Sequence, residues 1–262
     1  MLTIRHFIAL AVIALSSLAQ AQSTQKVIDI PTRPGITQRM IVLTPSEPKA
    51  AVILLAGGHG GLQVSPEGSI KWGGGNFLIR SRQLFADQGL LVAVVDAPSD
   101  RQSSPYLQGF RQTPEHIADL KAVIAWLREN SQVPVWLLGT SRGTQSAAYL
   151  ATDLTDKYGP DGIVLSSTIL SDAKSRPVSA MSLDKIRIPV LVVHHEQDGC
   201  QLCAYAEVPA LMAKLTNSPR SQVISFKGGQ SKGDPCEAFA YHGFNGLEEQ
   251  VVRQTAAWIL AK

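Results

Sequence analysis

A serine framed by glycines is the clearest chemical signal in the chain. The motif Gly-Thr-Ser-Arg-Gly occupies residues 139–143 and follows directly on the apolar run 133–138. A serine on a tight strand-to-helix turn adopts positive φ and leaves no room for side chains two positions away, a requirement that Gly139 and Gly143 meet. The motif therefore predicts a nucleophile elbow that exposes the Ser141 hydroxyl at the end of a strand.

A serine nucleophile needs a base to take its proton and an acid to hold that base in the right tautomer. The apolar run 188–193 leads into His-His-Glu-Gln-Asp-Gly at 194–199, and we expect Asp198 to be the acid. The glycine-rich segment 227–245 precedes the last predicted helix, and we expect its His242 to be the base. Such a base must be neutral, so the sequence predicts activity that falls as His242 is protonated.

Other titratable side chains near predicted strand ends have alternative roles. Asp172 follows the sixth predicted strand and is the alternative acid. His194 and His195 could orient Asp198, but at a strand end we expect them to be structural. His116 lies in the first turn of a predicted helix, where we expect it to be exposed.

Apolar runs alternate with helical patterns along the chain. Strands are predicted at 27–30, 39–43, 51–55, 90–95, 133–138, 163–165, 189–193 and 222–226. Helices are predicted at 76–87, from 113, after the serine motif, and at 204–215 and 247–260. The first two strands should pair antiparallel at one edge, and the longer remaining ones are apolar at consecutive positions, as in parallel strands covered on both faces. This pattern predicts an α/β fold, a three-layer α/β/α sandwich with a mostly parallel eight-stranded sheet.

The order Ser141, Asp198, His242, placed after the fifth, seventh and eighth predicted strands, resembles the α/β-hydrolase superfamily. Within it, the chain looks like a secreted serine esterase of the dienelactone-hydrolase kind. The resemblance covers essentially all of residues 22–262 and implies acyl transfer through an acyl-enzyme. No zinc-ligand pattern is present, and we expect neither a metal nor a cofactor.

The resemblance also implies two backbone donors for the reacting oxyanion. One is the amide of Arg142, directly after the nucleophile. The other is the amide of Gly58, in the run Ala-Gly-Gly-His-Gly-Gly at 56–61 after the third strand. Ala56 stands where relatives carry a histidine, and a plain flexible loop is the alternative reading of the glycines. We expect His59 to shape the site or bind substrate.

Substrate choice depends on what covers the site. Residues 166–185 separate the sixth and seventh strands, where larger relatives insert a helical lid, so we expect little or no cap. An open cleft with Trp72 and Tyr106 among its binding residues suits esters with compact groups. Amidase, peptidase and acyltransferase activities share the same first step, and a non-catalytic exported binding protein on this scaffold is a further alternative.

The three cysteines suit an oxidising compartment. Cys200 follows the predicted acid by two residues, and Cys236 precedes the predicted base by six. If the acid and the base meet, a disulfide between Cys200 and Cys236 would tie their loops together, and related secreted hydrolases look similar in placing a cysteine just after the acid. Cys203 would then be the odd thiol, with Cys203 to Cys236 as the alternative pairing.

Residues 1–21 have the layout of a secretory signal peptide. Arg5 and His6 precede the apolar stretch 7–15, and the small residues at 19–21 form a cleavage site. The apolar stretch is too short to span a bilayer comfortably. We therefore expect a single domain over 22–262, exported to a periplasm or beyond, without stable membrane association.

Charge argues against nucleic acid as a partner. Lys and Arg number 24 against 21 Asp and Glu, which gives a formal net charge of +3 at pH 7. We expect a small-molecule ester as the substrate, and the oligomeric state stays open.

Overall fold

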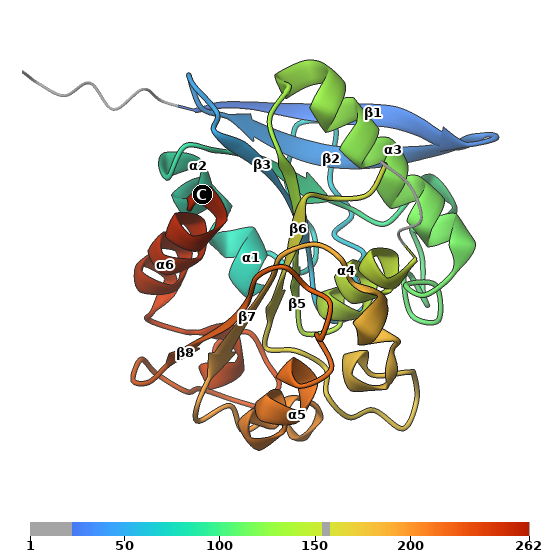
Figure 1. Ribbon diagram of the computed structural model, residues 1–262. Coiled ribbons are helices and arrows are strands. Elements are labelled where there is room, and N and C mark those ends of the chain that lie inside the picture. Colours follow the sequence, from blue (N-terminus) through green and yellow to red (C-terminus); the bar gives the residue numbers. More distant parts are fainter. Residues whose placement is uncertain (1–22, 154–157, 262) are drawn as a thin grey trace, which may run out of the picture.

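The computed structural model describes residues 23–153 and 158–261, and the predicted signal peptide lies outside them. Its centre is a twisted eight-stranded sheet (Figure 1). The strands are β1 (Thr24–Arg33), β2 (Ile36–Thr44), β3 (Ala50–Leu55), β4 (Leu90–Val95), β5 (Val135–Thr140), β6 (Gly162–Ser166), β7 (Val190–His195) and β8 (Ser221–Phe226). Their spatial order is β1-β2-β4-β3-β5-β6-β7-β8. β2 is antiparallel to both β1 and β4, and all other neighbours are parallel.

Helices cover both faces of the sheet, so the predicted three-layer architecture is confirmed. One layer holds α1 (Phe77–Arg80), α2 (Arg82–Asp87) and α6 (Glu248–Leu260), and the other holds α3 (Pro114–Ser131), α4 (Gly143–Thr152) and α5 (Val208–Met212). Successive residues of β3 point to opposite faces of the sheet. Ile53 packs in the core under α3 and α4, whereas Val52 and Leu54 pack in the core under α1, α2 and α6. All three are fully buried, which explains the consecutive apolar positions in the sequence.

Two predicted helices are shorter than the sequence suggested. The segment 76–87 is divided at Ser81, whose backbone angles of φ −91° and ψ 3° separate α1 from α2. The segment 204–215 is helical only in α5, after a 3-10 turn at Tyr205–Glu207. Pro209 lies in the first turn of α5, because proline lacks the amide hydrogen that an interior helical position donates.

The connection between β6 and β7 carries little structure above the sheet. Residues 167–189 contain only two short 3-10 turns, at Val178–Ala180 and Leu183–Lys185. This agrees with the expectation of little or no cap. No helix among residues 23–153 and 158–261 has the length and apolar character needed to cross a membrane.

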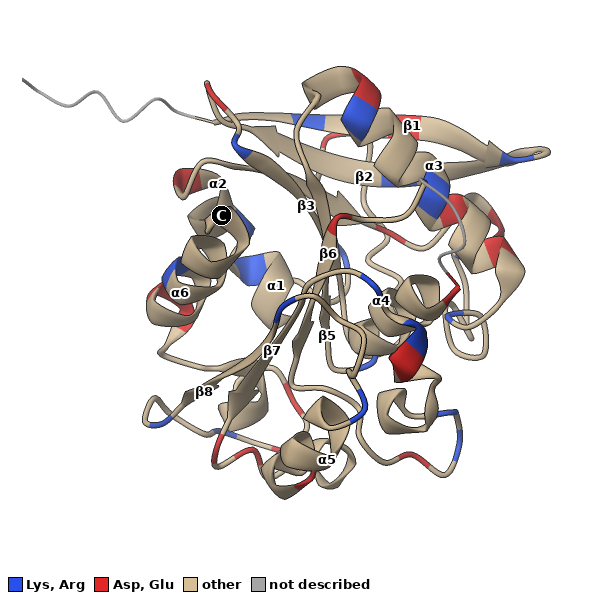
Figure 2. Cartoon of the chain, in the orientation of Figure 1, with Lys and Arg blue, Asp and Glu red and all other residues tan. Residues whose placement is uncertain are grey.

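The carboxyl ends of five parallel strands, β3, β5, β6, β7 and β8, meet at one edge of the sheet. In open α/β sheets, ligands bind at this edge. Basic and acidic residues are interspersed over the helices and loops around it (Figure 2). The three residues predicted to be catalytic, Ser141, Asp198 and His242, all follow strands that end at this edge.

Candidate active site

Ser141 stands at the turn between β5 and α4 in a left-handed conformation. Its φ is 51°, and its amide donates to the carbonyl of Ser166 on the neighbouring strand at 3.0 Å. A Cβ atom on Gly139 would collide with the carbonyl of Gly143, and one on Gly143 would collide with the carbonyl of Leu55. Both glycines are therefore fixed by backbone packing, which holds the serine at the amino end of α4.

Asp198 and His242 form a hydrogen-bonded pair at the ends of β7 and β8. His242 Nδ1 lies 2.9 Å from Asp198 Oδ2, and Asp198 Oδ1 accepts from the amide of Cys200 at 2.9 Å. The side chain of Asp198 is fully buried. Because Nδ1 is engaged by a carboxylate, the tautomer with Nε2 as the proton acceptor is favoured.

Ser141 and His242 line the same cavity, which has a volume of about 710 Å³. His242 Nε2 is buried and has no hydrogen-bond partner among the described residues. The structure records no hydrogen bond between Ser141 Oγ and this nitrogen. In unliganded sites such bonds are often long and tighten only when substrate binds.

Asp172, the alternative acid, forms its hydrogen bonds with residues other than His242. Arg142 donates to its carboxylate at 2.7 Å, and the amide of Lys174 donates at 3.0 Å. Burial favours the protonated form, but hydrogen bonds from Ser175, Lys174 and Arg142 outweigh it and lower the pKa of Asp172. The structure thus pairs His242 with Asp198 and not with Asp172.

The two residues expected to supply the oxyanion donors line the same cavity as Ser141. Gly58 has a φ of 57° in the loop after β3, and neither its amide nor that of Arg142 donates a hydrogen bond to any residue that the structure describes. Arg111 stabilises this loop by donating to the carbonyl of Ala56 at 2.9 Å and to that of Gly58 at 3.3 Å. Burial lowers the pKa of Arg111 to about 9, so its guanidinium keeps its charge at neutral pH.

Arg111 belongs to a buried polar cluster that also contains Ser146 and His116. Arg111 donates to Ser146 Oγ at 3.1 Å, and His116 Nε2 lies 2.9 Å from the same oxygen. The expectation that His116 is exposed is wrong, since only 4% of it is accessible. The first turn of α3 directs this ring inward, against Phe110 and toward α4, and burial lowers the pKa of His116 to about 3.

Of the three residues expected to bind substrate, only His59 lines the cavity. Its Nδ1 accepts from the amide of Gly61 at 3.1 Å, and its ring stacks on Tyr106 with the centroids 4.4 Å apart. Tyr106 is thus placed as support for His59. Trp72 is 48% exposed and does not line the cavity, and its Nε1 donates to Gln63.

Asn76, which the sequence analysis did not single out, also lines the cavity. A Cβ atom on Gly57 would lie 2.9 Å from Ser141 Cβ and 3.3 Å from Asn76 Nδ2, so the amide group is close to the nucleophile. Asn76 Oδ1 is buried without a hydrogen-bond partner among the described residues. An asparagine before a short helix carries no sequence signal for such a position.

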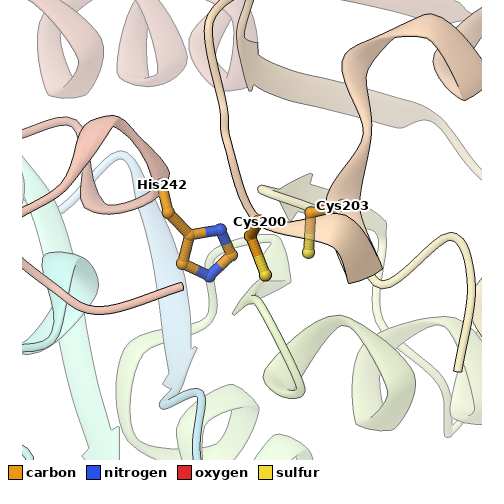
Figure 3. A group of neighbouring side chains, drawn as sticks. All are labelled: Cys200, Cys203 and His242. Atoms are coloured by element: carbon orange, nitrogen blue, oxygen red, sulfur yellow. The ribbon is translucent and has the colours of Figure 1, made fainter. Parts of the chain in front are cut away.

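Cys200 and Cys236 form a disulfide, and Cys203 is a buried free thiol. Figure 3 shows Cys200 between Cys203 and the ring of His242, and one potential ligand atom from each of the three lies within 4.8 Å of the others. Cys200 is already bonded to Cys236, so this trio does not offer two thiolates to a metal while the disulfide is intact. Burial raises the pKa of the Cys203 thiol, which keeps it protonated.

Contacts distant in sequence position the loop of His242. Ser167 Oγ donates to the carbonyl of His242 at 2.6 Å. Arg80 donates to the carbonyls of Gly75 and Gly243, each at 2.6 Å, and forms an ion pair with Glu248 at 2.8 Å. No local pattern marks these side chains, because the contacts of Ser167 with His242 and of Arg80 with Gly243 and Glu248 join segments far apart in the chain.

The two histidines at the end of β7 are buried, as their expected structural role requires. His195 Nε2 lies 2.9 Å from the carbonyl of Gly228, and its ring stacks on Tyr241. His194 has no partner for either ring nitrogen among the described residues, and burial lowers its pKa to about 4. His194 is therefore neutral at neutral pH.

Comparison with known proteins identifies the fold. No family model matches the chain, and no curated protein shows a significant match. Among solved structures, it is similar to a dienelactone hydrolase from Anabaena variabilis (TM-score 0.64, 14% identity, 91% of this chain and 98% of the other). It is also similar to an esterase from Pyrococcus furiosus (TM-score 0.65, 13% identity, 95% of both chains). A serine hydrolase without a lid from Xanthomonas campestris matches with a TM-score of 0.54 at 15% identity, over 89% of this chain and 95% of the other.

These likenesses, together with the strand order and the strand-to-helix turn at Ser141, show that the chain has the α/β-hydrolase fold.

Proposed function

We propose that this protein is an exported serine hydrolase that cleaves carboxylic esters through an acyl-enzyme. The observation that carries the proposal is the hydrogen bond of 2.9 Å between Asp198 and His242, because His242 lines the same cavity as Ser141, which has a positive φ. The residues proposed as nucleophile, base and orienting acid come from three distant segments and lie at one edge of the sheet. The esterases and hydrolases among the similar structures support the same chemistry.

In the proposed reaction, Ser141 Oγ attacks the ester carbonyl while His242 Nε2 accepts its proton. The negative charge that develops on the carbonyl oxygen accepts hydrogen bonds from the amides of Gly58 and Arg142. His242 then gives its proton to the departing alcohol. Water, deprotonated by the same nitrogen, attacks the acyl-enzyme and releases the acid, and Asp198 stabilises the imidazolium in both halves of the reaction.

The surroundings of the serine favour this charge development. The amino end of α4 lies directly behind Ser141, and its unpaired amides favour negative charge. Arg111 holds the carbonyls on either side of the Gly57–Gly58 peptide, so the Gly58 amide is oriented before substrate arrives. A preorganised donor needs no rearrangement when the transition state forms.

The short connection between β6 and β7 and the volume of about 710 Å³ support compact esters as substrates. We further propose that residues 1–21 are removed and that residues 22–262 act as one exported domain. The disulfide between Cys200 and Cys236 supports an oxidising destination, periplasmic or secreted.

Covalent labelling tests the proposal directly. A fluorophosphonate probe should modify purified protein at Ser141, and both labelling and hydrolysis of p-nitrophenyl acetate should disappear in Ser141→Ala. Ser46→Ala, at an exposed position between β2 and β3, is the control. A panel of esters graded by acyl length, with matched amides and alcohol acceptors, separates an esterase from an amidase, a peptidase or an acyltransferase. Absence of labelling in folded wild-type protein would favour a non-catalytic binding protein and overturn the proposal.

A further inference from the structure

A second cavity, of about 820 Å³, adjoins the one that contains the serine. Gly58, His59 and Arg142 line both cavities. The amides of Gly58 and Arg142 are the proposed oxyanion donors, so a reacting carbonyl would stand at the boundary between the two spaces. A substrate held there would project one of its two substituents into each cavity.

The second cavity, here called the basic cavity, is lined by Arg111, Arg142, Lys174 and Arg176 and by no acidic residue. Asp172 neutralises only Arg142. Over the residues that the structure describes, no carboxylate forms an ion pair with Arg111, Lys174 or Arg176.

The catalytic cavity differs, since Lys232, Asp234 and Glu237 give its rim both signs of charge. Basic and acidic positions also alternate along the helices and loops of the cartoon in Figure 2. The excess of positive charge thus distinguishes the basic cavity from the catalytic one.

Arg111 adds a charge that the fold does not compensate. Its guanidinium is buried, and its hydrogen bonds go to the carbonyls of Ala56 and Gly58 and to Ser146. These neutral acceptors satisfy its donors but do not cancel its charge. A buried cation without a carboxylate partner attracts an anion more strongly than an exposed one, because the surrounding dielectric constant is low.

Arg176 is held in place at the rim. Its Nε donates to Gln112 Oε1 at 2.9 Å, and its guanidinium lies 5.3 Å from the ring centre of Tyr149. Its carbonyl accepts from the side chains of Gln112 and Gln145, at 2.8 and 2.9 Å. This fixed orientation lowers the entropy lost when the guanidinium binds a planar oxyanion.

We propose that the basic cavity binds an anionic group, a carboxylate or a phosphate, attached to the acyl or the alcohol part of the ester. The inference rests on the proposed function and names the class of its substrate. Lys174 and Arg176 contact the anion, and the charge of Arg111 strengthens the binding from within the wall.

Matched ester pairs test the proposal. On the acyl side, p-nitrophenyl hydrogen adipate is compared with p-nitrophenyl heptanoate, and on the alcohol side 3-acetoxybenzoate with its methyl ester. We expect kcat/KM for the anionic member of at least one pair to exceed that for the neutral member, by about tenfold at low ionic strength and less at high salt. Inhibition by inorganic phosphate compared with inhibition by adipate distinguishes the two anion chemistries.

The Lys174→Gln/Arg176→Gln variant should lose most of this preference. Lys26→Gln/Arg253→Gln removes the same charge at exposed positions on β1 and α6 and should keep it. Equal ratios in wild type and in the Lys174→Gln/Arg176→Gln variant would overturn the inference, while hydrolysis of the neutral esters would leave the proposed function standing.

A measurement of binding affinity tests the inference even if no ester is cleaved. In a Ser141→Ala background, calorimetric titration should show tighter binding of the anionic member of at least one pair. Loss of that difference in Ser141→Ala/Lys174→Gln/Arg176→Gln would support the inference. Equal affinity for both members of each pair in Ser141→Ala would refute it.

Discussion

The hydroxyl of Ser167, at the end of β6, donates to the main-chain carbonyl of His242 at 2.6 Å. Ser167 is fully buried and has a positive φ of 44°. This bond holds the backbone of the proposed base, while Asp198 holds its ring. The imidazole is therefore fixed at both ends by segments that are distant in sequence.

Ser167→Ala should lower kcat with little change in KM. Loss of a buried hydrogen bond of this kind costs about 1 to 3 kcal/mol and would loosen the position of the base. Steady-state kinetics on a neutral ester measures the effect, and Ser65→Ala, at an exposed turn, is the control. A change in KM alone, with kcat preserved, would contradict a positioning role.

Asp198→Asn should reduce kcat by about 10⁴, because the amide favours the wrong tautomer of His242 and cannot stabilise the imidazolium. Asp172→Asn should reduce it far less, because Asp172 bonds to Arg142 and Ser175. Comparing kcat for the two variants, with folding checked by circular dichroism, decides which carboxylate serves the base. The reverse ranking would exclude Asp198 as the acid.

Removing the disulfide should lower both stability and activity. The bond joins residues separated by 36 positions, and closure of such a loop stabilises a fold by about 3 to 4 kcal/mol in the chain-entropy estimate. Cys200→Ser/Cys236→Ser should unfold at lower denaturant concentration and hydrolyse esters more slowly, because the loops of Asp198 and His242 are no longer tied. Adding a reductant should reproduce both effects in wild type but not in that variant.

Two buried histidines should make the fold sensitive to acid. Burial lowers the pKa of His116 to about 3 and that of His194 to about 4, from the ordinary 6.5. Below pH 6.5 the unfolded chain binds these protons and the folded chain does not, so the free energy of unfolding falls as pH falls toward the folded-state pKa values. The slope is up to about 1.4 kcal/mol per pH unit for each histidine, and it vanishes above pH 6.5.

Urea denaturation at a series of pH values from 8 to 5 measures this slope. His116→Gln should unfold with a shallower dependence than wild type, since one of the two protons is no longer involved. Identical slopes would show that His116 accepts a proton in the folded state.

Much of the fold could be predicted because its signals are local. Buried strands such as β3 and β5 are apolar at consecutive positions, and the glycines around Ser141 report a backbone turn within five residues. Asp198 and His242 could be proposed because parallel strands bring their carboxyl ends together, and the structure places these two side chains in contact.

The remaining features depend on packing between distant segments. The inward position of His116 follows from how α3 meets α4, and the roles of Arg80 and Ser167 depend on carbonyls 163 and 75 positions away. Trp72 does not line the cavity, and its Nε1 bonds to Gln63 in the same loop. Hydropathy and spacing contain no information on such contacts.

The left-handed backbone at position 141 has an evolutionary consequence. Glycine adopts that conformation without strain, so a chain with glycine in place of Ser141 would keep the architecture and gain stability. Selection for folding alone would therefore favour replacement of Ser141 by glycine, whereas selection for a reaction that needs its hydroxyl would retain the serine.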